Sequence, residues 1–207
     1  RWQTVRPFIG STATQMADQA IINEVGLRDG LQNQPVTVDT DTKARLARLL
    51  VDAGMRYLEP VSFVSPKAIP QMADAAALTP LLPQGDHLHY TALIPNLKGY
   101  QLAKEAGYPT VALVLSTTDS FNERNLRMSL EQAAQSCETI IAAAREDGIA
   151  TRTYISGAFA CPYDGPVPVS LPQQLAERMF AAGSNEVAIA DTIGAGNPQQ
   201  MKAIMTP

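Results

Sequence analysis

The sequence predicts an α/β fold in which a parallel sheet is covered by helices. Strand-like apolar runs alternate with helix-like segments along the chain, and this alternation is typical of repeated strand–helix units. The strand-like runs are largely unbroken by polar residues, as expected for strands buried on both faces. About six units fit into the 207 residues, whereas a complete barrel typically takes about 250. The sequence therefore allows an open six-stranded sheet or an incomplete TIM (β/α)8-type barrel.

The individual elements follow from local signals. The six predicted strands lie at residues 20–25, 57–63, 90–94, 111–115, 152–158 and 186–190. The predicted helices begin at residues that can cap a helix or start its first turn, namely Asp39 or Thr40, Ser129 with Gln132, Ser170 with Gln173, and Asn197 before Pro198. The first of these helices has apolar residues at helical spacing: Leu46, Leu49, Leu50 and Ala53. Residues 1–18 are predicted to form an irregular N-terminal arm, and residues 19–207 the barrel domain.

Composition excludes several classes of function. The chain is 45% apolar and 17% charged, with a net charge of −4, which is typical of a globular protein and argues against a nucleic-acid or anionic-membrane partner. No apolar run approaches the ~20 residues of a membrane span. The two cysteines, Cys137 and Cys161, do not make a disulfide framework. The first residues lack the apolar core of a signal peptide, so secretion is not expected.

The most informative stretch runs over residues 23–34, where a strand breaks into a turn. Gly26 and Gly30 bracket Leu27, Arg28 and Asp29, and glycines allow backbone angles that other residues avoid. A guanidinium can bind a carboxylate or an enolate oxygen through two parallel hydrogen bonds. The neighbouring carboxylate can bind a hard divalent cation. A surface ion pair on a tight turn is the alternative interpretation.

Further polar residues are predicted on or directly after the other strands, and in parallel barrels the chemistry is found on the loops after the strands. These candidates are Glu59, Ser62, Asn96, Lys98, Asn125, Arg152, Cys161, Asp191 and Thr192. Glu59 and Asp191 could instead each be the acidic member of a buried structural ion pair. Cys161 could be a small packing residue, and Cys137 is predicted to be part of the core.

Five segments, in this order, resemble the 3-hydroxy-3-methylglutaryl-CoA lyase family, which belongs to a wider group of metal-dependent barrel enzymes. They are residues 23–34, residues 59–67 with Pro70-Gln71-Met72, residues 95–99, residues 161–165 and residues 191–194. The resemblance favours the incomplete barrel over a Rossmann sheet. The chain also lacks a G-x-G-x-x-G after its first strand.

The resemblance implies a carbon–carbon lyase that cleaves 3-hydroxy-3-methylglutaryl-CoA, or a related 3-hydroxyacyl-CoA, into acetyl-CoA and acetoacetate with the help of Mg²⁺ or Mn²⁺. Such an enzyme serves leucine degradation and ketone body metabolism, is cytoplasmic (mitochondrial in a eukaryote), and is expected to be a homo-oligomer. Arg28 would stabilise the enolate, and Asp29 would bind the metal. Asp191 would orient the metal site without binding the metal itself. Glu59 and Cys161 are the other catalytic candidates. The expected substrate-binding residues, besides Arg28, are Gln32, Ser62, Asn125, Arg152 and Thr192.

Several features depart from the family pattern. The family's metal-binding H-x-H pair follows the seventh strand, which would lie beyond Pro207, whereas His87-Leu88-His89 precedes the third strand here and is not expected to bind the metal. Pro35, Pro60, Gly157 and the run 116–118 also differ from the family. These departures leave two alternatives open: a related condensing or aldolase-type enzyme, and a catalytically inactive fragment that lacks the metal histidines.

Overall fold

The protein is described by a computed structural model that covers residues 20–206, so the arm predicted at residues 1–18 lies outside the described part. The chain divides into two compact units, residues 1–91 and 92–207, and the division falls inside strand β3 (His89–Leu93). One sheet contains the strands in the order β1-β2-β3-β4-β5-β8. Strands that follow one another in sequential order match a (β/α)8 barrel. In a Rossmann sheet the strand order reverses at a switch point in the middle of the sheet. The predicted incomplete barrel is confirmed.

The first unit contains three strands and several short helical segments. They are β1 (Asn23–Glu24), the π-helical turn η1 (Gly26–Gly30), α1 (Thr40–Asp52), β2 (Tyr57–Ser62), η2 (Pro70–Met72), α2 (Ala75–Leu78), η3 (Thr79–Leu81) and β3. The predicted cap of α1 is confirmed, because the Asp39 carboxylate accepts a hydrogen bond from the Thr42 amide at 2.9 Å. The predicted apolar face is partly wrong. Leu49 is 55% exposed, and α1 instead buries Lys43, Ala44 and Ala47.

Pro60 lies inside β2, a position where a proline usually disrupts a ladder. Strand β1 pairs with β2 only at Asn23–Tyr57 and Glu24–Leu58. The carbonyl of Arg56 accepts a hydrogen bond from the His89 amide at 2.8 Å, so the backbone groups of alternate residues along β2, Pro60 among them, are directed toward β3. The missing amide of Pro60 therefore removes no bond between β1 and β2.

The second unit continues the strand–helix alternation. Its elements are α3 (Leu97–Glu105), β4 (Thr110–Ser116), α4 (Asp119–Leu126), α5 (Leu130–Glu146), β5 (Ala150–Ser156), β6 (Ala160–Cys161), β7 (Gly165–Pro166), α6 (Ser170–Ala182), β8 (Glu186–Ile189) and α7 (Pro198–Met205). Strand β5 pairs in parallel with both β4 and β8. Strands β6 and β7 form a separate two-stranded antiparallel sheet.

Two of the three helix caps predicted in this unit are present in the structure. The capping box of Ser129 and Gln132 at the start of α5 is confirmed, as is the helix start at Asn197 and Pro198. The Ser170–Gln173 cap is wrong. Val169 precedes α6 without a side-chain cap, and the Gln173 amide donates instead to the carbonyls of Ala203 and Ile204, each at 3.1 Å. A tertiary bond to the end of α7 has replaced the local one.

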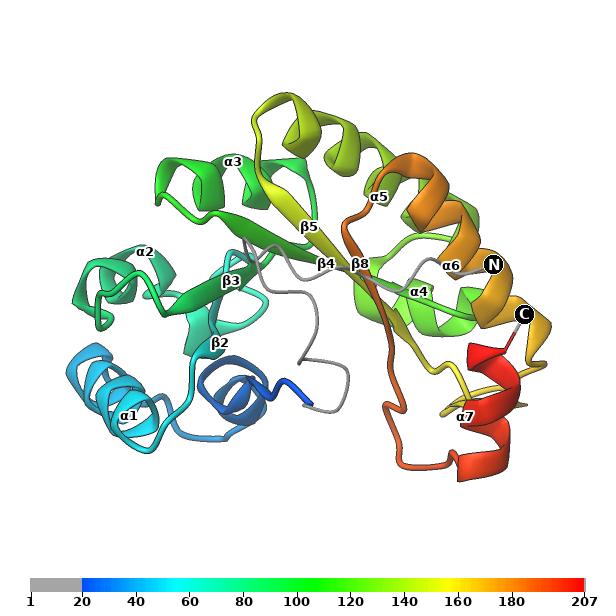
Figure 1. Ribbon diagram of the computed structural model, residues 1–207, viewed down its shortest axis with the longest axis horizontal. Coiled ribbons are helices and arrows are strands. Elements are labelled where there is room, and N and C mark those ends of the chain that lie inside the picture. Colours follow the sequence, from blue (N-terminus) through cyan, green and yellow to red (C-terminus); the bar gives the residue numbers. More distant parts are fainter. Residues whose placement is uncertain (1–19, 207) are drawn as a thin grey trace, which may run out of the picture. The chain divides into compact units, whose positions relative to one another are not determined.

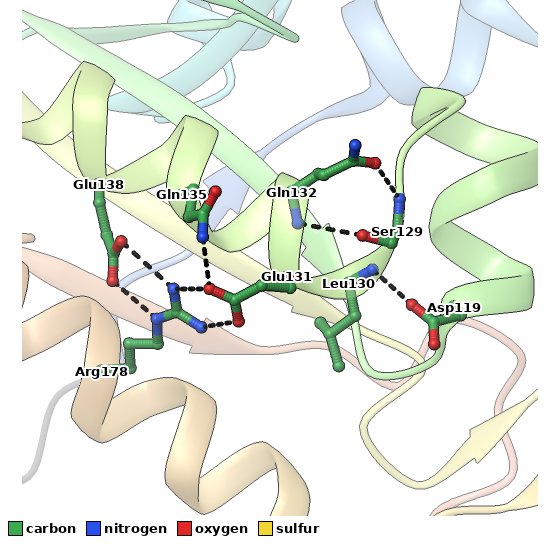
Figure 2. Close-up of polar contacts among 8 residues, drawn as sticks. All are labelled: Asp119, Ser129, Leu130, Glu131, Gln132, Gln135, Glu138 and Arg178. Carbon is green, nitrogen blue, oxygen red and sulfur yellow. Dashed lines mark hydrogen bonds and ion pairs between the residues drawn. The ribbon is translucent and has the colours of Figure 1, made fainter.

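Helices α5 and α6 pack on one face of strands β4, β5 and β8 (Figure 1). The predicted apolar face of α5 is buried there and includes Ala133, Cys137, Ile140, Ile141 and Ala144. On the surface Arg178 of α6 bridges two carboxylates of α5 (Figure 2): its Nη1 lies 2.6 Å from Glu131 Oε2, and its Nε lies 2.7 Å from Glu138 Oε1. These ion pairs join α6 to α5 at the surface.

Within residues 20–206, no helix combines the length and the apolar character needed to cross a bilayer.

Candidate functional site

The turn after β1 brings Arg28 to its position. Glycine-specific backbone angles were predicted here, but this is wrong, because neither Gly26 nor Gly30 is among the glycines with positive φ. Gly26 instead lies close to a neighbouring carboxylate. Its amide donates to Glu24 Oε1 at 2.5 Å, and a Cβ at residue 26 would lie 2.7 Å from the same oxygen. The glycine thus permits a close approach of backbone and carboxylate.

Arg28 is the centre of a charged cluster in the first unit. Its Nε donates to Glu59 Oε1 at 2.7 Å, its Nη2 contacts the same oxygen, and its Nη1 donates to Asp29 Oδ1 at 2.7 Å. The Arg28 side chain is 10% exposed and that of Glu59 is fully buried. A buried carboxylate that is paired in this way fixes the plane of the guanidinium. The interpretation of Arg28 and Asp29 as a simple surface pair is therefore wrong for Arg28.

Asp29 is the exposed member of this cluster, with 54% of its side chain accessible. Gln32 Nε2 donates to Asp29 Oδ1 at 3.2 Å, so the substrate-binding candidate Gln32 lies beside the predicted metal ligand. Among residues 20–206, Oδ2 of Asp29 accepts no hydrogen bond from a side chain or an amide. An exposed carboxylate oxygen of this kind is a suitable ligand for a hard divalent cation.

The described residues supply one such ligand and not a complete metal site. Within residues 20–206, His, Cys, Asp and Glu side chains do not gather in any group of three or more that could hold a metal ion. His87 and His89 are both exposed, and the His89 ring stacks on Tyr57 with centroids 4.4 Å apart. The pair was predicted to precede the third strand, and His87 does so, whereas His89 is the first residue of β3.

Ser62 is the last residue of β2 and is fully buried. In the part of the chain that the structure describes, its hydroxyl has no hydrogen-bond partner. Buried polar atoms without partners are uncommon, which leaves the hydroxyl available to a ligand. Within residues 20–206 no hydrogen bond joins it to Arg28.

In the second unit, Arg152 forms an ion pair with Glu186 in which Nε and Oε2 are 2.9 Å apart. The two residues are register partners in the β5–β8 ladder. Burial by itself lowers the pKa of Arg152, but the Glu186 and Tyr154 side chains raise it above its usual value. Arg152 is the third residue of β5 and Glu186 the first of β8. The prediction that the charged residues gather at the carboxyl ends of the strands is therefore wrong for Arg152.

Cys161 lies at the end of β6 in a polar network. Its sulfur accepts hydrogen bonds from Thr118 Oγ1 at 3.0 Å and from the Tyr163 amide at 3.4 Å, and it lies 3.4 Å from Asp164 Oδ2. Ser120 also donates to Asp164, and this bond is the main reason that the pKa of Asp164 is lowered. Cys161 is 2% exposed. Its bond with Thr118 connects the segment after β6 to the start of α4.

Asp191 and Thr192 follow β8, as predicted, and both are exposed. The Asp191 carboxylate accepts hydrogen bonds from the amides of Ala195 and Gly196, each at 2.9 Å. Thr192 Oγ1 accepts a hydrogen bond from the Gly157 amide at 2.9 Å. Thr192 therefore joins the loop after β8 to the residue that follows β5, whereas Asp191 fixes the turn within its own loop. The alternative of a buried ion pair holds for Glu59, which pairs with Arg28, but not for Asp191, which is exposed.

Asn125 was predicted in a loop after the fourth strand, and this is wrong, because it lies on the exposed surface of helix α4. The same helix supplies groups that sequence reasoning missed. Thr118 caps α4, and the Asn122 side chain bonds both the amide and the carbonyl of Ser116, at 2.9 Å and 2.7 Å. The available signal was the polar run 116–120 directly after an apolar strand. Asn96 caps α3 in the same way, with its side chain accepting from Gly99 N at 3.0 Å.

Sequential parallel strands, with polar groups on the turn after β1, are typical of the (β/α)8-barrel class of proteins. The model of the family described as HMGL-like matches residues 19–207. The chain belongs to this HMGL-like family.

Relatives and solved structures agree with this assignment. The mitochondrial hydroxymethylglutaryl-CoA lyase of Bos taurus is 36% identical over 203 residues, which are 98% of this chain and 62% of the relative. The cytoplasmic 3-hydroxy-3-methylglutaryl-CoA lyase of Danio rerio is 39% identical over 185 residues, 89% of this chain and 55% of the relative. The structure of an HMG-CoA lyase from Acinetobacter baumannii in complex with coenzyme A and 3-methylmalate has a TM-score of 0.84 at 34% identity, covering 89% of this chain and 60% of that one. The chain thus spans 55–62% of the length of these proteins.

Proposed function

We propose that this chain belongs to a carbon–carbon lyase that cleaves 3-hydroxy-3-methylglutaryl-CoA, or a closely related 3-hydroxyacyl-CoA, into acetyl-CoA and a keto acid. For the first substrate the keto acid is acetoacetate. The relatives that bear the name of this lyase support the substrate class. The observation that carries the proposal within this chain is the buried contact of Arg28 with Glu59 on the turn after β1.

The reaction requires a proton to leave the tertiary hydroxyl of the substrate. The bond between the second and third carbons of the acyl chain then breaks, and its electron pair passes to the thioester carbonyl. This gives the enolate of acetyl-CoA, which takes up a proton on carbon. Negative charge thus develops on the thioester oxygen only as the bond breaks, and a fixed donor aimed at that oxygen lowers the barrier.

Arg28 is suited to be that donor. Its guanidinium stays charged and planar, and Glu59 fixes its plane through Nε and Nη2. Nη1 is the nitrogen directed toward the exposed Asp29 side chain, so a substrate oxygen at Asp29 would meet the guanidinium on that side. In this proposal Glu59 positions Arg28 and does not touch the substrate.

We also propose that Asp29 contributes one ligand to a divalent metal ion, Mg²⁺ or Mn²⁺. When bound, such an ion would polarise the substrate's hydroxyl and carboxyl oxygens as a Lewis acid. Gln32 keeps the Asp29 carboxylate oriented through its bond to Oδ1. In the second unit Arg152, Asn125 and Thr192 remain the proposed acyl-binding residues. For Cys161, which is buried, we propose a packing role in place of a catalytic one.

The assembly and location of the whole protein are further parts of the proposal. We expect a homo-oligomer that acts on an acyl-CoA substrate. Its compartment would be the cytoplasm, or the mitochondrion in a eukaryote, since relatives of both kinds match this chain.

The test is a coupled assay of acetyl-CoA release from 3-hydroxy-3-methylglutaryl-CoA by the full-length protein. We expect turnover that depends on added Mg²⁺ or Mn²⁺ and is abolished by EDTA. The proposal would be overturned by turnover no faster than the uncatalysed background with every 3-hydroxyacyl-CoA tested.

A further inference from the structure

The Pro70-Gln71-Met72 segment has no part in the proposed chemistry, although it lies in the connection that follows β2. Pro70 begins the short helix η2, and Met72 is buried at its end. Gln71 lies between them and is half-buried. Its side-chain amide donates to the carbonyl of Gln34 at 2.7 Å. This bond joins two segments that are 37 residues apart in the sequence.

Gln34 ends the segment that carries Asp29. Its own amide side chain donates to the carbonyl of Gly30 at 3.0 Å, and its backbone amide donates to the carbonyl of Leu31 at 3.1 Å. The bond from Gln71 therefore fixes the end of a short hydrogen-bonded segment, residues 29–34, which is otherwise exposed along much of its length.

The backbone carbonyl of Gln71 is bonded to a buried charged side chain, that of Lys43. The ammonium of Lys43 donates to the carbonyl of Gln71 at 2.5 Å and to Asp74 Oδ1 at 2.6 Å. Thr40 completes the arrangement by donating to Asp74 Oδ2 at 2.9 Å. Lys43 is only 1% exposed. A buried ammonium must keep its partners, because an unpaired buried charge is strongly unfavourable, so this end of the chain of bonds is rigid.

We propose that Gln71 is a positioning residue for the reaction: anchored by the Lys43–Asp74 pair, it fixes residues 29–34 and so the orientation of the Asp29 carboxylate and of Gln32. This inference rests on the proposed function, since it treats Asp29 as part of the reacting site. Groups that orient a metal ligand without touching the metal typically change metal affinity or activity 10- to 100-fold when they are removed.

The variant Gln71→Met tests the proposal in the full-length protein, because methionine keeps the length of the side chain and removes the donor. Gln84→Met is the matched control. Gln84 also donates to a backbone carbonyl, that of Leu82 at 2.9 Å, but its bond is local to one loop. Lys43→Met serves as a second variant that removes the buried anchor.

Three measurements are compared between the variants: hydrogen exchange at the amides of Leu31 and Gln34, the Kd for Mn²⁺, and the separate values of kcat and KM. We expect Gln71→Met to melt at the temperature of the Gln84→Met control, to exchange faster at both amides, and to lose about tenfold in Mn²⁺ affinity and in kcat/KM. Lys43→Met should show the same local pattern together with a lower Tm.

Unchanged exchange at Leu31 and Gln34 in Gln71→Met would overturn the proposal, because Gln71 would then not hold the segment. Faster exchange with unchanged Mn²⁺ affinity and unchanged kcat/KM would overturn it as well. A failure of the proposed function is recognised separately, as an unmodified protein that neither binds Mn²⁺ nor cleaves the substrate.

Discussion

Arg28 Nε lies 2.7 Å from Glu59 Oε1, and the Glu59 side chain is fully buried. Burial of a carboxylate is tolerable only when a cation compensates it, and the Arg28 guanidinium loses its buried counter-charge if the carboxylate is removed. The pair therefore links the position of a reactive group to the stability of the first unit.

Glu59→Gln should destabilise the protein by about 3–5 kcal/mol, because it removes the buried counter-charge of the guanidinium and leaves only the exposed Asp29 beside it. Denaturant unfolding of the variant and of the unmodified protein measures this difference. Asp29→Asn is the control. Since Asp29 is 54% exposed, its loss should change the unfolding free energy by less than about 1 kcal/mol. Equal small effects of the two substitutions would contradict the account of the buried pair.

Gly157→Ala should be more destabilising than Gly148→Ala. Both glycines have left-handed backbone angles, with φ of 68° and 71°, so alanine costs about 1–2 kcal/mol at either position. A Cβ at residue 157 would also lie 3.2 Å from Phe121, whereas at residue 148 it would meet nothing within 4 Å. Thermal melting of both variants measures the additional cost at Gly157. Identical Tm values would mean that Phe121 moves freely.

Arg178→Met should reduce stability at neutral pH and have little effect in acid. Hydrogen bonds from Arg178 lower the pKa of Glu131 below its usual value of 4.5. The stabilisation is therefore present above pH 4.5 and is lost as the pH falls through the lower pKa of the folded state. The Tm difference between variant and unmodified protein should shrink between pH 7 and pH 3. Arg145→Met is the control, since Arg145 forms no ion pair within residues 20–206, and a similar trend there would contradict the explanation.

Cys161→Ala should lower the Tm and leave kcat nearly unchanged. The sulfur is buried and its neighbours are Thr118, Tyr163 and Asp164, so its removal loosens the segment between β6 and β7. Steady-state kinetics on the variant would show otherwise if Cys161 exchanged a proton with the substrate. A general acid or base typically contributes a factor on the order of 10²–10⁴, and a loss of that size would restore Cys161 to the reacting groups.

The order of strands and most helix starts could be predicted because their signals are local. Ser129 and Gln132 cap α5 from within four residues of sequence, and the apolar strands are continuous runs. The failures arise where a distant contact competes with a local one. Gln173 bonds the end of α7 and does not cap α6, and β1 is reduced to two residues because the chain turns at Gly26.

Part of the site could also be predicted from the sequence. Arg28, Asp29 and Glu59 follow from the rule that polar residues on barrel strands and the turns after them meet, and the structure brings them together. The role of Gln71 could not be predicted, because it depends on the buried Lys43. A lysine near the start of a helix carries no sequence signal of burial, and only the packing of α1 on α2 gives it that environment.

The central claim is that Arg28 acts on the transition state, and steady-state kinetics on Arg28→Lys in the full-length protein test it most directly. Lysine keeps the charge but loses the planar pair of donors, and loss of one aimed donor typically costs about 10²–10³ in turnover. We predict a fall in kcat of that order with KM nearly unchanged, and an Asp29→Asn variant whose defect is partly recovered by added Mg²⁺ or Mn²⁺. A near-native kcat for Arg28→Lys would contradict the account.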